Sequence, residues 1–179
     1  MSLVFPALVA ALCLTLHTSD VHASYANRWD KEFRFECPEG EVLRNVLSVH
    51  SNLMEDRRFM FSCGAAPFGG RPSTCKWTHD YVNDFDEPIN FMCEPDAVLT
   101  GVDSINSNDH QDRRMKFKCC KATGYKTASC GLTPYLNAWD SMMTYNVPPG
   151  KVLTGWFSVH SDGAQDRRHK MLFCNYNTQ

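Results

Sequence analysis

The feature that most restricts the fold of this chain is a short motif, Asp-Arg-Arg leading into an alternating run that ends in cysteine, which occurs in three copies. The copies occupy residues 55–63, 111–120 and 165–174. Runs at 33–37, 89–93 and 143–147 precede them at matching distances, and a Val-Leu pair lies between the two runs in every copy. The chain is therefore one unit of roughly 55 residues written three times, with repeats at about 29–63, 85–120 and 139–174.

Within each repeat, apolar and polar residues alternate. In the first repeat Phe33, Phe35 and Cys37 alternate with Arg34 and Glu36, a pattern typical of a half-buried strand. Residues 42–51 and 56–63 predict two more strands, so each repeat is expected to form its own set of antiparallel strands joined by short turns. The segments 64–74 and 121–135 are expected to be irregular links. No long helical period occurs, so the predicted fold is all-β, with three pseudo-repeats of antiparallel strands.

Residues 1–23 differ from the rest of the chain. An apolar run at 3–16 is followed by polar residues and by a small residue before Ser24, which predicts a secretory signal peptide. The run is too short to span a bilayer. We therefore expect a mature domain at 24–179 that is secreted into the extracellular space or matrix. A formal net charge of -2 gives no overall attraction to nucleic acid, which is not expected as a partner.

Without Cys13, which lies in the signal peptide, the chain keeps an even number of cysteines, which in an exported protein predicts disulfides. Zinc is the alternative, but no pair has the Cys-x-x-Cys spacing of a zinc knuckle. Equivalent positions should make equivalent bonds, and repeat three has Val147 where its cysteine would be. The expected pairs are Cys37–Cys63, Cys93–Cys119, Cys75–Cys120 and Cys130–Cys174, and each such loop closure typically contributes about 2 to 4 kcal/mol.

These residues together resemble the dermatopontin family, in its invertebrate branch of hemagglutinins and amebocyte aggregation factors. The resemblance covers the whole mature chain. It rests on Trp29-Asp30, the segment 37–40, the segment 48–51, the three Asp-Arg-Arg cores and Cys119-Cys120. The tryptophan that follows Asp-Arg in the family motif is replaced here by Phe59, Met115 and His169. The pattern also looks distantly like pseudo-threefold β-prism proteins, and a β-trefoil is the alternative for three repeats.

The resemblance implies a non-catalytic extracellular protein that binds cell-surface or matrix glycans, such as glycosaminoglycans, and promotes cell adhesion or aggregation. Its implied partners also include matrix proteins such as collagen and cell surfaces, and a homo-oligomer is compatible with it. The alternative function is a matrix scaffold that organises collagen fibrils through protein partners, without glycan binding. No Gly-x-Ser-x-Gly, phosphate loop or His-Glu-x-x-His sequence occurs, and neither an enzyme nor a cofactor is expected.

The first Asp and Arg of each core are expected to be structural. A carboxylate at the start of a strand can cap a turn, and an Arg there can be held between strands by bidentate hydrogen bonds. Binding of a ligand by these pairs is the weaker alternative. The structural ion pairs are therefore predicted at Asp56, Arg57, Asp112, Arg113, Asp166 and Arg167.

The second Arg of each core is placed by the alternation on the opposite face of its strand. This face predicts a basic stripe that could bind sulfated or carboxylated polysaccharide through several weak contacts. A solvated strand face is the equally weighted alternative. The stripe comprises Arg58, Arg114, Lys116, Lys118, Arg168 and Lys170.

A metal site is suggested by three histidines, His50, His110 and His160, because His50 and His160 occupy matching positions. They lie in different repeats with no second ligand nearby in sequence. Ordinary strand or loop histidines are the preferred interpretation, and no metal site is predicted.

Overall fold

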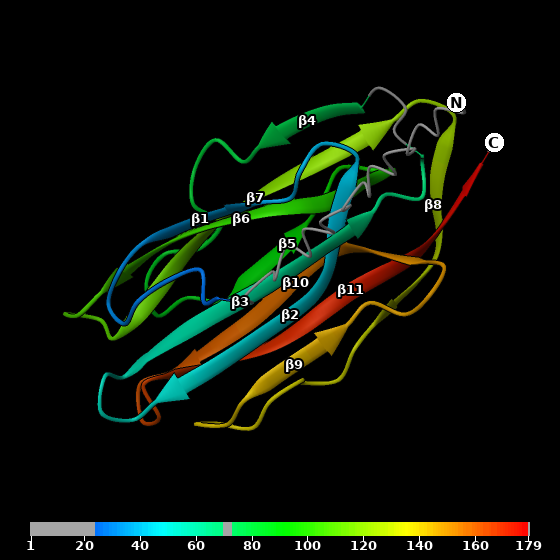
Figure 1. Ribbon diagram of the computed structural model, residues 1–179. Coiled ribbons are helices and arrows are strands. Elements are labelled where there is room, and N and C mark those ends of the chain that lie inside the picture. The colour runs from blue at the N-terminus through cyan, green and yellow to red at the C-terminus, as the bar shows by residue number, and fades with distance from the viewer. Residues whose placement is uncertain (1–23, 70–72, 179) are drawn as a thin grey trace, which may run out of the picture.

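The structure is a computed structural model that describes residues 24–69 and 73–178. The predicted signal peptide at 1–23 lies outside these residues. The described chain contains eleven strands and no helix, so the prediction of an all-β protein is confirmed, and no helix there could cross a membrane. The strands are β1 (Phe33–Glu36), β2 (Glu41–Ser51), β3 (Asp56–Ala65), β4 (Ser73–Trp77), β5 (Ile89–Met92), β6 (Ala97–Ser107), β7 (Asp112–Ala122), β8 (Tyr125–Leu132), β9 (Met143–Asn146), β10 (Lys151–Ser161) and β11 (Asp166–Thr178) (Figure 1).

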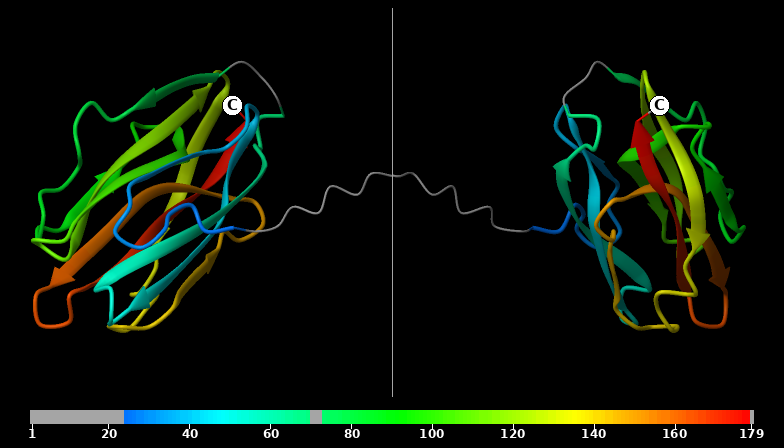
Figure 2. Two further views of the ribbon diagram at one scale, coloured as in Figure 1. Left: turned by 60° about the vertical axis from the view of Figure 1, so that its left-hand side comes forward. Right: turned by 90° about the vertical axis from the view of Figure 1, so that its right-hand side faces the viewer.

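The strands form three sheets, with the orders β1-β6-β7-β4, β5-β10-β11-β8 and β3-β2-β9. Each repeat supplies one long antiparallel hairpin, β2–β3, β6–β7 or β10–β11. These hairpins run along the length of the molecule in both views of Figure 2. The three-repeat layout is compatible with the pseudo-threefold, prism-like arrangement suggested by the sequence.

The short first strand of each repeat does not join its own hairpin. Strand β1 pairs with β6 of the second repeat, β5 pairs with β10 of the third, and β9 pairs with β2 of the first. The expectation that each repeat forms its own set of strands is therefore wrong. Because β9 of the third repeat pairs with β2 of the first, the exchange of strands is cyclic. One edge of every hairpin is therefore covered by a strand from a neighbouring repeat.

The two links between repeats also differ from the prediction. The link expected at 121–135 contains β8, which pairs antiparallel with β11. The link expected at 64–74 overlaps the first two residues of β4, which pairs antiparallel with β7. Cys75 lies directly opposite Cys120 in the β4–β7 register, and the disulfide between them holds this short edge strand in place.

The four disulfides in the structure are the pairs expected from the repeats. Cys37 follows β1, which pairs with the second repeat, whereas Cys63 lies in β3 of the first repeat. The bond between them therefore ties the exchanged strand back to its own hairpin. In the third repeat Val147 is buried and Phe173 packs against the core at the matching places, so an apolar contact replaces the disulfide.

The core lies between the three hairpins. The residues that replace the family's tryptophan, Phe59, Met115 and His169, are all fully buried there. Trp156 packs between Phe59 and Phe117, with ring centroids 6.3 and 5.6 Å away. A second, smaller apolar cluster around Phe68 and Tyr176 fills the other end of the hairpins. The face of each β3-type strand that carries the first Arg is thus the inner face.

Candidate functional site

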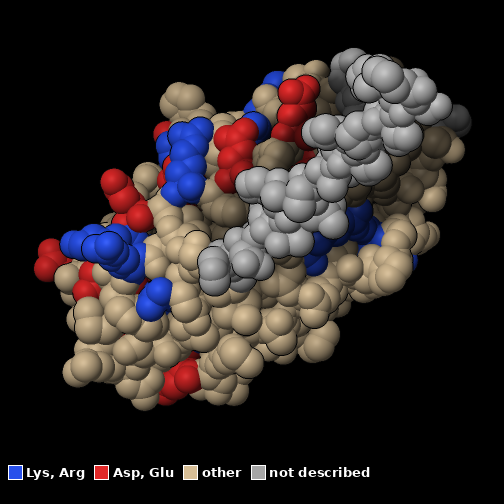
Figure 3. All heavy atoms as spheres, in the orientation of Figure 1, with Lys and Arg blue, Asp and Glu red and all other residues tan. Residues whose placement is uncertain are grey.

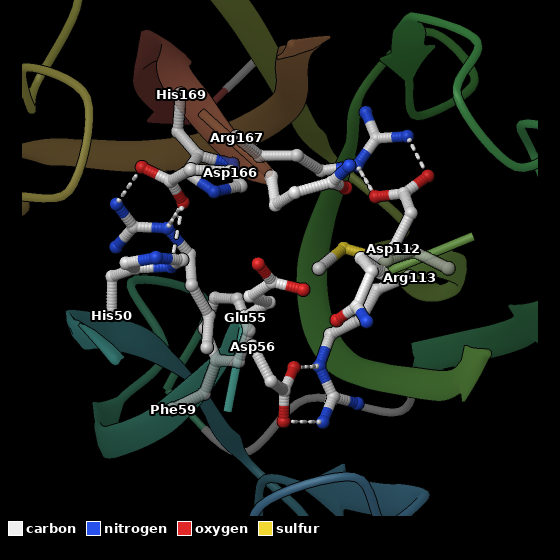
Figure 4. A pocket seen from close by; sticks show the side chains of 13 residues that line it. His50, Glu55, Asp56, Phe59, Asp112, Arg113, Asp166, Arg167 and His169 are labelled. Atoms are coloured by element: carbon white, nitrogen blue, oxygen red, sulfur yellow. Dashed lines mark hydrogen bonds and ion pairs between the residues drawn. The ribbon is translucent and has the colours of Figure 1, made fainter. Parts of the chain in front are cut away.

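The three Asp-Arg pairs form a ring of ion pairs that connects the repeats (Figure 4). Every arginine binds the aspartate of a different repeat. The pairs are Arg57 with Asp166, Arg113 with Asp56, and Arg167 with Asp112. Each is bidentate, with Nε–Oδ1 distances of 2.5, 2.6 and 2.5 Å and Nη2–Oδ2 distances of 2.8, 2.8 and 2.6 Å in that order. The direction of pairing is the same at all three junctions, so the ring closes as the strand exchange does.

Each aspartate of the ring also caps a turn. The backbone N–H of Asp30, Asp86 and Asp140 donates to the Oδ2 of Asp56, Asp112 and Asp166 respectively, at 2.8 to 2.9 Å. All three donors have a positive φ, between 59° and 67°, a conformation that Asp adopts more readily than most residues. The carboxylates therefore fix both a neighbouring arginine and a strained turn.

Three buried asparagines, which the sequence analysis did not single out, hold the segment before each first strand. Asn27 accepts from the N–H of Phe59 and donates to the carbonyl of Arg57. Asn83 and Asn137 do the same in the other repeats. The signal was present, because Asn precedes an aromatic residue and Asp at the same spacing in all three copies.

The ring is buried, and its charged side chains are paired with one another. All six of its side chains belong to residues at most 4% exposed. Burial alone would raise the pKa of Asp166, but the contacts with His50 and Arg57 outweigh burial and lower the pKa of this carboxyl well below its ordinary value. The carboxylate of Asp166 is therefore ionised, as its bidentate pairing with Arg57 requires.

The space enclosed by the ring is too small for a ligand. Its volume is about 20 Å³, and Glu55 points into it (Figure 4). A single water molecule needs on the order of 10–15 Å³ by such a measure. The ring thus has the geometry of a structural connection between repeats, which agrees with the structural role expected for these six residues.

The second arginine of each core lies on the outer face of its strand, where it stacks on two aromatic side chains. These groups are called here the first, second and third cation–aromatic clusters. The clusters are Arg58 with Tyr25 and Trp29, Arg114 with Tyr81 and Phe85, and Arg168 with Tyr135 and Trp139. In the same order, the guanidinium carbon lies 3.9, 4.9 and 4.2 Å from the tyrosine centroid and 5.3, 5.5 and 4.5 Å from the second ring.

A lysine completes two of the clusters. Lys116 lies 4.8 Å from the ring of Tyr81, and Lys170 lies 4.4 Å from the ring of Tyr135. In the first repeat Met60 stands at the matching place. Each cluster therefore presents a cation held against an aromatic surface, an arrangement suited to recognising flat, polar and anionic ligands.

The six predicted stripe residues are not one stripe. They lie on β3, β7 and β11, which belong to three different sheets. Lys118 is further removed from any cluster because its ammonium group pairs with Glu36 on β1. On the face shown in Figure 3, basic side chains lie beside acidic ones instead of forming a continuous basic band. The alternation predicted the face correctly, but it could not predict that the copies separate in space.

A shallow groove lies next to the second cluster. It is lined by the rings of Trp77 and Phe91, by the exposed side chain of Met92, and by polar groups including His79 and Lys121. Its volume of about 420 Å³ is within the range of small-molecule sites. Lys116 connects the two features, since its Nζ donates to the carbonyl of His79.

The fold and the ring define a class of protein: an all-β, disulfide-linked chain whose three repeats interlock through exchanged strands and buried ion pairs. The profile of the dermatopontin family matches residues 27–178. The chain belongs to the dermatopontin family. This agrees with the resemblance noted from the sequence.

Three curated relatives are similar over most of the chain. The hemagglutinin/amebocyte aggregation factor of Limulus polyphemus is 37% identical, covering 94% of this chain and 95% of that protein. Millepora cytotoxin-1 of Millepora dichotoma is 37% identical over 84% of this chain and 66% of its own length. Dermatopontin of Biomphalaria glabrata is 34% identical over 84% of this chain and 99% of that protein. Comparison with solved structures gives no match.

Proposed function

We propose that this protein is a secreted, non-catalytic adhesion protein of the extracellular space or matrix that binds cell-surface or matrix glycans and promotes adhesion or aggregation of cells. The observation that carries the proposal is the threefold occurrence of the cation–aromatic cluster. Relatives named as a hemagglutinin/amebocyte aggregation factor and as dermatopontin support it. The glycans that fit are sulfated or carboxylated polysaccharides, including glycosaminoglycans.

The chemistry of one cluster suits a weak glycan contact. Arg114 keeps 30% of its side chain exposed while its face is covered by Tyr81 and Phe85. Stacking and the hydrogen bond from Nε to the carbonyl of Asn83 fix the guanidinium group before any ligand arrives. Nη2 of Arg114 lies 3.1 Å from Oδ1 of the exposed carboxylate of Asp84. An anionic group of the ligand can replace that carboxylate with little loss of side-chain entropy.

Repetition of the cluster can raise the overall avidity for a glycan although each single contact stays weak. The clusters lie on separate sheets of one rigid frame, so a long polysaccharide or a cell surface can engage more than one of them, and overall avidity exceeds the affinity of any single cluster. Agglutination also requires sites that can be reached by different cells, which three separate clusters provide.

Retention on a heparin column tests the proposal. The double variant Lys116→Gln, Lys170→Gln removes one cation from each of two clusters, whereas Lys118→Gln, Lys121→Gln removes the same charge from lysines outside the clusters that contact Glu36 and Asp96. We expect the first variant to elute at clearly lower salt, because exposed ionic contacts are screened, and the second to elute near the wild type. Equal shifts in both variants would mean that only net charge matters, and no shift in either would refute cluster binding.

The alternative is a matrix scaffold that organises collagen fibrils through protein partners. A glycan array with varied salt separates the two functions. Saturable binding that weakens as salt rises supports the glycan proposal. Absence of binding to every glycan on the array, together with binding of the same preparation to immobilised collagen, supports the function of a matrix scaffold. Because one relative is named a cytotoxin, dye-loaded liposomes belong in the same series, and we expect no release.

A further inference from the structure

A group of metal-ligand side chains lies at the junction of the second and third repeats. Ligand atoms of Asp86, Asp112 and His160 all lie within 4.8 Å of one another. Nδ1 of His160 is 3.5 Å from Oδ1 of Asp86 and 3.3 Å from Oδ1 of Asp162. We propose that this group binds one divalent transition-metal ion of the zinc type.

His160 itself points to a ligand. Its side chain is only 2% exposed. Within the described part of the chain, neither of its ring nitrogens makes a hydrogen bond. A buried imidazole without hydrogen bonds is costly, and a metal ion bound to Nδ1 removes part of that cost.

The spacing of the donor atoms fits a small dication. Zinc binds nitrogen and oxygen ligands at about 2.0–2.2 Å, so neighbouring ligands of a tetrahedral site lie about 3.4 Å apart. The two distances from Nδ1 of His160, 3.3 and 3.5 Å, agree with that value. Asp112, the remaining member of the group, supplies the fourth donor, since within the described residues its Oδ1 accepts the Nε–H of Arg167 and retains a lone pair.

The charges also fit. Asp86 and Asp112 place two carboxylates in the group, and Asp162 adds a third beside His160. Among the described residues, the guanidinium group of Arg167 pairs with Asp112. Two negative charges are left, which a divalent cation neutralises. His110 holds the second oxygen of Asp86, with 2.9 Å between Nδ1 and Oδ2. It can orient that carboxylate as outer partners of metal ligands commonly do.

The other two junctions provide an internal comparison. Both keep the two aspartates, and the junction of repeats three and one also keeps a buried histidine, His50, but neither junction has all of the remaining donors. Where this junction has His160, Asp162 and His110, the junction of repeats three and one has His50, Asn52 and Ala164, and the junction of repeats one and two has Asn106, Asn108 and Met54. We therefore infer a single site per chain, located where all ligand types coincide.

The donor set selects the class of ion. Calcium prefers six to eight oxygen ligands, whereas a set of one imidazole and three carboxylates suits zinc and similar borderline ions. The cysteines do not compete for zinc, because all eight in the described chain are in disulfides.

Isothermal titration of the oxidised, tag-free and EDTA-treated mature protein with zinc chloride tests the site, with calcium chloride as the comparison. We expect one zinc ion per chain and no calcium binding at this site. His160→Asn, which copies Asn106, should abolish zinc binding. His50→Asn is the matched control and should leave the stoichiometry and affinity unchanged.

Exposed ligands give a second test that does not depend on a buried substitution. Asp162→Asn and His110→Ala copy the junction of repeats three and one, and the two side chains are 87% and 47% exposed, so both variants should fold. Together they should weaken zinc binding about tenfold or more. Absence of zinc binding, an equal loss in His50→Asn, or retention of full affinity in His160→Asn would overturn the site.

Discussion

Replacing His169 by methionine should flatten the dependence of stability on pH between pH 8 and pH 5. His169 is fully buried, and Nε1 of Trp156 donates to its Nδ1 at 3.0 Å. The ring is thus a neutral acceptor at Nδ1. Burial, with the positive charges of Arg57 and Arg167, lowers its pKa well below the ordinary value. Methionine should fit, because Met115 occupies the same position in the second repeat and is fully buried.

The magnitude follows from linkage between protonation and folding. An unfolded histidine has a pKa of about 6.5. Below that pH the unfolded chain binds a proton that the folded chain does not, so the free energy of unfolding falls as pH falls, by about 1.4 kcal/mol per pH unit. The loss at pH 5 is about 2 kcal/mol relative to pH 8. The lowered pKa of Asp166 affects stability only at lower pH. Its stabilising contribution is complete above the unfolded pKa of about 3.9 and is lost only below that pH.

Urea unfolding with the disulfides intact, followed by tryptophan fluorescence at pH 5, 6, 7 and 8, measures this effect. Subtracting the two pH profiles removes the contribution of groups common to both proteins. The variant should be less stable at pH 8, since Trp156 loses its acceptor, but its profile should be flatter by about 2 kcal/mol. Parallel profiles would mean that the native state protonates His169, and the reasoning would be refuted.

Arg57→Ala should lower the free energy of unfolding by about 3–5 kcal/mol, because it leaves Asp166 buried without its partner, while heparin retention per folded molecule stays close to wild type. Arg58→Ala should do the reverse, with a stability cost of about 1 kcal/mol and reduced retention, and thermal melts beside the column assay separate the two. Gly155→Ala should be destabilising by about 1–3 kcal/mol, since the added Cβ would lie 2.7 Å from the carbonyl oxygen of Phe91. Gly163→Ala, whose added Cβ meets nothing closer than 3.9 Å, should stay within about 0.5 kcal/mol of wild type in the same urea titration.

The repeat made much of the fold predictable. Alternation identified the strands and their inner faces, and equivalence between copies gave the cysteine pairs. The partner of each first strand was not predictable, because period-two alternation reports which face is buried but not which edge a strand joins. A strand such as β1 satisfies its alternation equally well against its own hairpin or against β6. The partners of the arginines were hidden for the same reason, since Arg57 meets an aspartate 109 residues away.

The candidate site was partly predictable. The sequence placed Arg58, Arg114 and Arg168 on the outer face, but it did not identify the aromatic rings that stack on them. The residues that replace the family's tryptophan, Phe59, Met115 and His169, lie in the core instead. The rings that stack on the arginines come instead from the segments before the first strands. Contact between these segments and the hairpins depends on buried asparagines such as Asn27, which only the tertiary structure reveals.

Ring closure connects the three repeats to the positions of the three cation–aromatic clusters. Each repeat gives a strand to the next hairpin and takes an aspartate partner from the previous one, so no repeat can satisfy its buried Arg or cover its hairpin edge alone. The β9–β2 pairing and the Arg57–Asp166 ion pair make the last junction equivalent to the other two. The three clusters are therefore held in fixed relative positions. A rigid spacing raises the effective concentration of the second contact once the first has formed. Under the proposed function, individually weak glycan contacts would therefore add to stable adhesion only while the ring is intact.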